Sequence, residues 1–253
     1  MRMAWALLLI AIAVTPARAY RPFVSTDAAV ADRGDVEVEF GAIGFRSGSG
    51  RTSIVAPTVI GNLGIARDME VVAEFKLVND LSHPQEDPTR FEDTAVSFKW
   101  IAHEGVLQDH GGTPSFGIEL SLLVPTLDGE HRPGGELVGI MSGMGLGWTY
   151  HLNAGVLVEP SRTSADPVWG VIVEHALCGP VRAVAEVNGA SATGNGPDDS
   201  ALLGAIWEVK VPPPIRALSF DVGLRHGITH SADEWGGTAG LTIAFPLGGR
   251  ILR

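Results

Sequence analysis

The sequence has few charges, few basic residues and almost no cysteine. Charged residues make up 19% of its 253 positions, below the usual share of about a quarter. The 18 lysines and arginines stand against 29 acidic residues, a net charge of -11, which excludes a nucleic-acid partner because binding phosphates needs a basic surface. Cys178 is the one cysteine, so no internal disulfide can form. We interpret it as a small apolar filler at a strand end, with a reactive thiol as the lesser alternative.

The sequence also lacks any apolar run after Tyr20 that reaches the roughly 18 residues of a transmembrane helix. One shorter run, Ala4 to Val14, follows Arg2 and precedes Pro16 and Ala17-Arg18-Ala19. A basic start, an apolar centre and an A-x-A site are typical of a cleaved signal peptide. We therefore predict a signal peptide over 1–19 and one domain over 20–253. A retained membrane anchor is the alternative for the first segment.

No phosphate-binding loop, dinucleotide fingerprint or zinc-ligand spacing occurs in the chain. We accordingly expect no cofactor, no metal site and no catalytic residue. The nearest approach to a catalytic group is a polar cluster near the end of the chain, and it has no recognisable triad spacing. A solvated loop is the favoured interpretation, and a lipid-modifying site at a barrel rim is the alternative. The cluster comprises Asp221, His226, His230, Ser231, Asp233 and Glu234.

What the chain has instead is glycine and alternation. Its 32 glycines exceed the usual share of about 7%, and apolar residues recur at every second position, as in Phe116-Gly117-Ile118-Glu119-Leu120. This period of two is typical of β-strands. We predict twelve strands: Asp35–Phe45, Thr52–Leu63, Met69–Asn79, Asp93–Ala102, Ser115–Pro125, Leu137–Leu146, Thr149–Glu159, Trp169–Cys178, Val181–Ala190, Ala201–Val211, Ala217–Gly227 and Gly237–Phe245.

The segments between these strands alternate in length. Asp80–Glu92, Thr126–Glu136 and Pro160–Val168 are long and polar, whereas Gly64–Asp68 and Gly179-Pro180 are short. Long outer loops, short periplasmic turns and an even strand number are typical of bacterial outer-membrane barrels. The exception is His103–Pro114, a long connection on the side that should be short. The fold prediction is therefore all-β, a single antiparallel transmembrane barrel, with a soluble β-sandwich as the alternative.

Aromatic residues fall near several predicted strand ends. They are Trp148, Tyr150, Trp169, Trp207 and Trp235, with Trp207 the most central. Aromatics at that level suit the two membrane interfaces, and ordinary core packing is the alternative.

Three parts of the sequence resemble a known family of outer-membrane transporters, which is named for the meta-pathway of phenol degradation. They are Arg21–Ala29 followed by Gly34–Gly41, then Leu152–Gly155, and last Leu218–Thr229 with Trp235–Phe245, where the resemblance is strongest. The resemblance implies an outer-membrane barrel that takes up or exports small solutes, hydrophobic or aromatic ones among them. Many outer-membrane barrels end on an aromatic residue that the assembly machinery reads. This chain departs from that pattern, because Phe245 is followed by Pro246–Arg253.

The barrel prediction turns a set of charged residues inward. These candidate lumen-lining residues are Glu74, Lys76, Lys99, Glu119, Arg182, Glu186, Glu208, Lys210, Asp221 and Arg225. Charges inside a narrow barrel must be paired or hydrated, because an isolated buried charge is very costly. Two interpretations stay open: a polar pore with an acidic bias, or a plugged lumen whose ion pairs hold the barrel shut.

The functional expectation is thus an outer-membrane channel or transporter for a small solute, not an enzyme. The partners are outer-membrane lipid, the barrel assembly machinery and the solute. A closed structural or surface-interaction barrel is the alternative, with a rim enzyme behind it.

The export signal makes the first testable prediction. If cleavage follows Ala19, the mature chain starts at Tyr20. Terminal sequencing of the exported protein checks this, and retention of residues 1–19 would contradict it.

Overall fold

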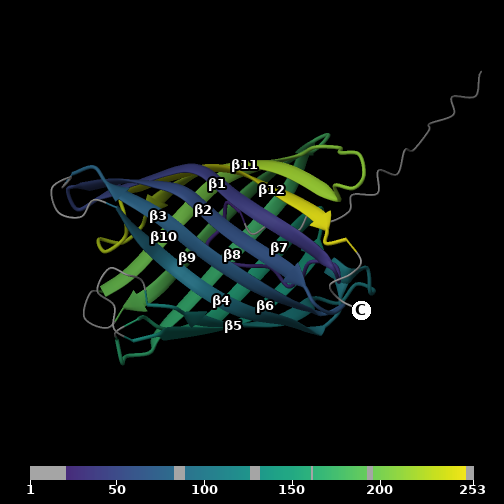
Figure 1. Ribbon diagram of the computed structural model, residues 1–253, viewed down its shortest axis with the longest axis horizontal. Coiled ribbons are helices and arrows are strands. Elements are labelled where there is room, and N and C mark those ends of the chain that lie inside the picture. The colour runs from purple at the N-terminus through teal and green to yellow at the C-terminus, as the bar shows by residue number, and fades with distance from the viewer. Residues whose placement is uncertain (1–20, 83–88, 126–131, 161, 193–195, 249–253) are drawn as a thin grey trace, which may run out of the picture.

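Twelve antiparallel strands form one closed barrel in the computed structural model (Figure 1). The structure describes residues 21–82, 89–125, 132–160, 162–192 and 196–248. Each strand pairs with its neighbour in sequence, and β1 closes the barrel on β12 from Asp35↔Pro246 to Ser47↔Trp235. Closure onto a single sheet excludes the β-sandwich, which needs two packed sheets. No helix in these ranges is long and apolar enough to cross a membrane.

The strand prediction is confirmed for all twelve elements, with differences at the ends. The observed strands are β1 Asp35–Gly48, β2 Arg51–Gly64, β3 Met69–Asp80, β4 Thr89–His103, β5 Ser115–Leu123, β6 Gly134–Gly145, β7 Trp148–Val158, β8 Asp166–Cys178, β9 Val181–Ala192, β10 Gly196–Glu208, β11 Ala217–Gly227 and β12 Trp235–Pro246. The prediction carried β10 as far as Val211. The strand ends earlier because Pro212, Pro213 and Pro214 follow closely and have no N–H for the ladder.

The two ends of the barrel differ. We call the end at which β1 begins and β12 ends the base, and the opposite end the mouth. At the base, β6 and β7 are joined by two residues and β8 and β9 by two residues, whereas several connections at the mouth are longer. The long base connection between β4 and β5 contains a short 3-10 helix, η1 (Val106–Gln108). Its Leu107 is buried, so this exception to the length pattern packs against the base of the barrel.

The outward face of the barrel is apolar. Leu120, Leu203 and Val222 are each more than half exposed. The inward neighbours of Leu120 and Val222 in sequence are polar or small, as with Ser121, which is buried. A soluble protein rarely exposes so continuous an apolar surface, whereas lipid-facing strands require it.

Aromatic side chains gather at both ends of this outward face. Phe45, Phe91, Trp169 and Trp235 lie toward the mouth, and Trp100, Phe116, Trp148, Trp207 and Phe220 lie toward the base; all are exposed. Trp207 is next to the last residue of β10, so it lies nearer the strand end than the sequence indicated. Two such belts match the interfacial girdles of membrane barrels.

The interior, in contrast, is polar. Its most deeply buried large side chains include Lys99, Glu39, Glu70 and Glu186. Only small apolar clusters occur among the described residues, such as Val184, Leu202 and Ile206. The barrel therefore has the reverse of the arrangement in a soluble protein: its apolar side chains face outward and its polar side chains face inward.

Neighbouring positions on β5 give a direct test of the two faces. Leu120→Arg places a charge in lipid and should destabilise the barrel by about 2–4 kcal/mol. Ser121→Arg places the same side chain in the lumen, opposite Glu136 on β6, and should cost far less. Reversible unfolding in lipid vesicles measures both variants, and an equal loss in the two would contradict the assignment of faces.

Candidate functional site: the barrel lumen

Residues Arg21–Ala31, which precede β1, run inside the barrel, and we call them the inner segment. It forms no strand with the wall, yet its contacts extend from Glu70 on β3, through Asn153 on β7 and Glu186 on β9, to Asp221 on β11. The inner segment therefore follows the inside of the wall around much of the lumen.

Wall side chains bind the backbone N–H groups of the inner segment. The amides of Val24 and Ser25 donate to the carboxylate of Glu186, with the Ser25 N to Oε1 distance at 2.7 Å. Thr26 donates to Asn153 Oδ1 at 3.0 Å. Further towards β1, Ala28 donates to Ser142 Oγ at 2.8 Å and Ala31 to Glu70 Oε2 at 2.7 Å. Buried backbone donors need such partners, and here the wall strands supply them from side chains.

Two cationic contacts fasten the inner segment further. Arg21 donates from Nε to Asp221 Oδ2 at 3.4 Å and from Nη2 to Thr238. Lys99, which is fully buried, donates to Thr26 Oγ1 at 3.0 Å and pairs with Asp27 Oδ1 at 3.4 Å. Burial raises the pKa of Asp27, but its interactions with Lys99, with His151 and with the Ala29 N–H together outweigh burial and lower the pKa of Asp27. The segment thus has an ion pair with the wall at its start and another near its middle.

Glycines on the wall leave room for the segment. A Cβ on Gly41 would lie 2.5 Å from Arg21 Nη1, and a Cβ on Gly170 would overlap Ser25 Oγ. A Cβ on Gly223 would lie 3.2 Å from Pro22 Cβ, a less severe contact. Part of the glycine richness of the sequence is therefore explained by the space that a chain inside the barrel needs.

Apolar side chains of the segment pack into the two small clusters of the interior. Ala28 and Val30 pack with Ile101 and Ile140. Phe23 packs against the cluster of Val184, Leu202 and Ile206. Burying these groups adds hydrophobic free energy to the polar contacts.

The base connection closes over this arrangement. Gln108 at the end of η1 donates from Nε2 to the Ala28 carbonyl at 2.7 Å, and Ser115 Oγ donates to Gln108 Oε1 at 2.6 Å. The long connection between β4 and β5 thus holds the inner segment at the base.

A buried relay of hydrogen bonds lies next to Ala28. Ser142 Oγ is 2.8 Å from His151 Nδ1, and His151 Nε2 is 3.0 Å from Glu174 Oε1; the Glu174 carboxylate also pairs with Arg182. Serine, histidine and a carboxylate are the components of a hydrolase triad. Here the Ser142 side chain is fully buried and accepts the Ala28 N–H, so the relay is a support for the inner segment.

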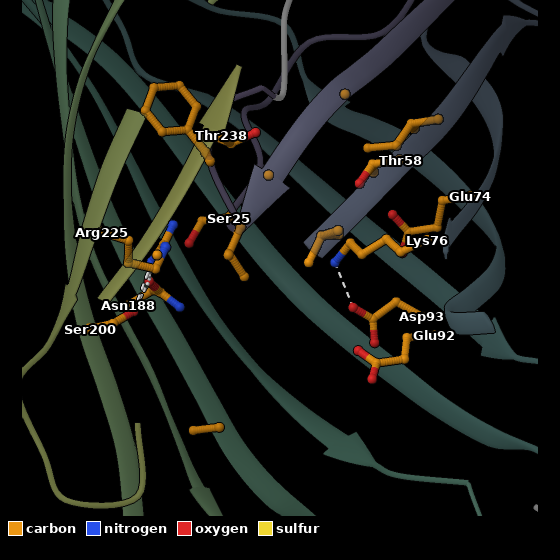
Figure 2. Close-up of a pocket in the computed structure, with 18 of the residues that line it drawn as sticks. Ser25, Thr58, Glu74, Lys76, Glu92, Asp93, Asn188, Ser200, Arg225 and Thr238 are labelled. Atoms are coloured by element: carbon orange, nitrogen blue, oxygen red, sulfur yellow. Dashed lines mark hydrogen bonds and ion pairs between the residues drawn. The ribbon is translucent and has the colours of Figure 1, made fainter. Parts of the chain in front are cut away.

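Above the inner segment, a cavity of about 980 Å³ reaches toward the mouth. Residues 21–26 form part of its lining. Figure 2 shows Glu74, Lys76 and Asp93 on one side and Asn188 with Arg225 on the other. Eight acidic and five basic side chains line the cavity, so its formal charge is negative.

The bases that line the cavity are engaged with particular acids. Lys76 pairs with Asp93 at 2.5 Å, Arg46 and Arg90 both bind Glu92, and Arg225 pairs with Glu186 at 2.5 Å. Other lining acids have no ion pair with a base within the described ranges, and these are Glu74, Glu119, Glu136 and Asp198. Three of these four belong to β3, β5 and β6. The negative charge is therefore concentrated on that side of the cavity.

Most sequence-predicted lumen residues lie inside the barrel. Glu74, Lys76, Glu119 and Arg225 line the cavity. Nearer the base, Arg182 pairs with both Glu174 and Glu208. Lys99, Glu186 and Asp221 bind the inner segment. Lys210 is different: it follows the end of β10 and is exposed, so its assignment to the lumen was wrong.

Sequence reasoning missed the inner segment and its partners on the wall. Arg21, Ser142, His151 and Asn153 were not predicted as luminal contacts. The available signal was the stretch before Asp35, which is rich in small residues and has no alternation. Its hydrogen bonds to the wall join residues that are 39 to 217 positions apart, and no local pattern encodes them.

The polar cluster proposed as an alternative rim site is dispersed. Asp221 is buried beside Arg21. His226 is exposed, packs on Trp235 at 4.4 Å between ring centroids, and binds the Glu234 carbonyl through Nδ1. His226 and Asp221 alternate across β11, so they point to opposite faces. The described residues thus offer no acid–histidine pair for a site there.

The fold and its polar, partly filled lumen define a closed β-barrel of the outer-membrane type. The crystal structure of the COG4313 outer membrane channel from Pseudomonas putida F1 is similar, with a TM-score of 0.61 at 10% identity over 86% of this chain and 97% of that chain. The OmpTdeltaL8 loop-deletion mutant from Vibrio cholerae aligns with a TM-score of 0.42 at 9% identity, over 87% and 100% of the two chains. No family model and no curated protein matches the chain. The likeness at these identities concerns the fold, and the family resemblance of the sequence stays a prediction.

Glu186 provides a test of how the inner segment is held. Glu186→Gln removes the charge that binds two amides and Arg225, and hydrogen bonds to charged groups contribute about 1.5–3 kcal/mol each. We expect a loss of stability of at least about 2 kcal/mol in lipid-vesicle unfolding. The matched control is Glu136→Gln, which neutralises an acid that binds neither the inner segment nor a base within the described residues. Equal stability of the two variants would contradict the proposed anchoring.

Proposed function

We propose that this protein is an outer-membrane channel for small polar solutes, with the base in the periplasm and the mouth outside. The inner segment closes the channel at rest. A solute reaches the cavity from the mouth, and passage requires the inner segment to move.

The observation that carries this proposal is that the inner segment lies across the lumen at the base side of the cavity. Residues 21–26 lie across the lumen below the 980 Å³ cavity, and the inner segment is held by side-chain hydrogen bonds and two ion pairs. These residues share no strand ladder with the wall. A segment that is attached in this way can move out of the lumen without breaking the hydrogen bonds of the sheet. A strand that is paired with the wall could not.

The lining supports a preference for cations. Glu74, Glu119 and Glu136 face the cavity without paired bases in the described structure. Carboxylates along a narrow aqueous path lower the energy of a cation and raise that of an anion. The polar lining favours hydrophilic solutes over the hydrophobic or aromatic ones that the family resemblance implies.

A closed structural barrel is the second candidate. It is favoured by the number of contacts that hold the inner segment, including the buried Lys99 and Glu186. In that case the interior network stabilises the wall, and no solute passes.

A reversible tether separates the two candidates. An added Cβ on Gly170 would lie 2.9 Å from Ser25 Cβ, within about 1 Å of the spacing in a disulfide. The variant Ser25→Cys/Gly170→Cys, with Cys178→Ser to remove the native thiol, fastens the inner segment when oxidised. Planar-bilayer conductance should be near zero when oxidised and should rise after reduction.

The control is the variant Ser25→Cys/Cys178→Ser, which has one cysteine and should not respond to reductant. Equal conductance in both redox states would mean that solutes bypass the inner segment. Absence of conductance in both states, and in the native protein, would defeat the channel proposal and leave the structural barrel.

Removal of the unpaired acids should change selectivity. Glu74→Gln and Glu136→Gln should lower the ratio of cation to anion permeability stepwise, and high salt should weaken the effect because mobile ions screen an aqueous path. The control is Glu104→Gln. Glu104 lies outside the cavity, in the connection between β4 and β5, where it pairs with Arg67. Reversal potentials in a salt gradient measure the ratio. An unchanged ratio in both Glu74→Gln and Glu136→Gln would contradict the assigned role of the lining.

A further inference from the structure

Three connections at the base, those that follow β6, β8 and β10, present exposed apolar side chains. Leu146 in the first connection is 100% exposed, and Leu177, which leads into the second, is 60% exposed. The third connection contains three exposed prolines at 212–214. We call residues 144–148, 177–180 and 209–216 together the base patch.

Hydrogen bonds place the three connections side by side. His175 on β8 donates from Nδ1 to the Gly147 carbonyl at 2.9 Å, which joins the first connection to the strand that leads into the second. The Glu208 N–H at the end of β10 donates to the Pro180 carbonyl at 2.9 Å, which joins the second connection to the start of the third. The base patch is therefore one continuous surface at the base of β6 to β11.

The backbone at Leu146 is unfavourable for a leucine. Its φ is 53°, in the left-handed region that bulky side chains rarely adopt and that glycine or asparagine tolerates. The fully exposed side chain gains no burial within the barrel in return. Backbone strain at an exposed apolar residue points to a role outside the chain.

The base patch continues the aromatic belt at the base. Trp148 follows Leu146 by two positions, and Trp207 precedes Val209 by two positions. Both tryptophans are exposed on the outward face. Because a strand rises about 3.3 Å per residue, Leu146 lies within about 7 Å of the belt, which is the depth of the lipid headgroups.

Charge separates this side of the base from the other side. The base patch contains Lys210 and Arg216 and no acidic residue. Lys210 is exposed and forms no ion pair within the part of the chain that the structure describes. Arg216 pairs with Asp35 through Nε at 3.2 Å, yet its side chain is 63% exposed. The connection between β4 and β5 instead contains Glu104 and Asp109, which phosphate groups would repel.

We propose that the base patch lies in the phospholipid headgroup layer, with Lys210 and Arg216 bound to lipid phosphates, while the connection between β4 and β5 stays in water. The barrel is thus immersed more deeply on the side of β6 to β11. The leucines supply apolar contact and the two bases supply charge complementary to phosphate. This placement depends on the lipid-facing surface and not on whether the barrel conducts.

Cys178, which is exposed within the base patch, provides a native probe of depth. The full-length folded barrel is labelled there with bimane in vesicles of phosphatidylcholine and phosphatidylglycerol. Lipids that carry a nitroxide on the headgroup should quench this label, and iodide present on both sides of the membrane should quench it weakly.

The control for depth is Asp109→Cys/Cys178→Ser, which carries the label on the connection between β4 and β5. Iodide should quench this label strongly, and the nitroxide lipids should quench it weakly. Equal quenching of the two labels by iodide would overturn the proposal and leave a water-exposed surface for a protein partner.

The variant Leu146→Asn gives opposite signs for the two environments. Asparagine tolerates the left-handed conformation, so in water the variant should unfold at the same urea concentration as the native barrel or at a higher one. In the headgroup layer the lost apolar contact outweighs that relief, and we expect unfolding from vesicles at a lower urea concentration. The control is Asp109→Asn, at a residue with φ 59°, which should not lower the midpoint. A midpoint of Leu146→Asn at or above the native value would contradict the proposal.

The contact with phosphate is tested by Lys210→Gln. This variant should raise about fivefold the mole fraction of nitroxide-labelled phosphatidylglycerol that half-quenches the label on Cys178. Arg67→Gln, which changes an exposed base in the connection between β2 and β3, should leave that mole fraction unchanged. The same value for Lys210→Gln and the native barrel would contradict the binding of phosphate by the base patch.

Discussion

The structure depends on the compensation of charge inside a narrow barrel. Lipid takes the apolar side chains on the outward face, so acids and bases on the alternate positions turn inward. Charges in such a space must be paired, hydrogen-bonded or hydrated. The protein meets this requirement in two ways: near the base the inner segment and buried pairs satisfy the charges, and toward the mouth a cavity leaves room for water.

The inner segment links these two halves. Its amides satisfy the carboxylates of Glu186 and Glu70, and its side chains pair with Lys99 and Asp221. Because these groups are on strands from β3 to β11, the segment also ties together distant parts of the wall. The same contacts that stabilise the barrel therefore close the lumen, which couples stability to the control of passage.

The strands and their faces could be predicted from the sequence because alternation is local. The alternation of apolar and polar residues around Leu120 and Ser121 predicts that Leu120 faces lipid and that Ser121 faces the lumen. The partners of the charged residues could not be predicted in this way. Lys76 pairs with Asp93 across a register shift between β3 and β4, and this shift has no sequence signal. Lys210 was misplaced because the strand was extended too close to the proline run.

The inner segment was beyond prediction for a related reason. Ala28 donates to Ser142, 114 positions later, and a segment without periodicity normally indicates a surface loop. Its small residues fit beside wall glycines such as Gly170 and Gly223. Only the closed barrel shows that these two sets of small residues face one another.

The central claim is that side chains of the wall hold the inner segment inside the lumen. Hydrogen exchange of the Val24, Ser25, Thr26, Ala28 and Ala31 amides, in the full-length protein in lipid bilayers, tests it most directly. The account predicts slow exchange at these positions, and faster exchange at Val24 and Ser25 alone in Glu186→Gln. Exchange at the rate of an unfolded peptide throughout residues 21–31 of the native protein would contradict it.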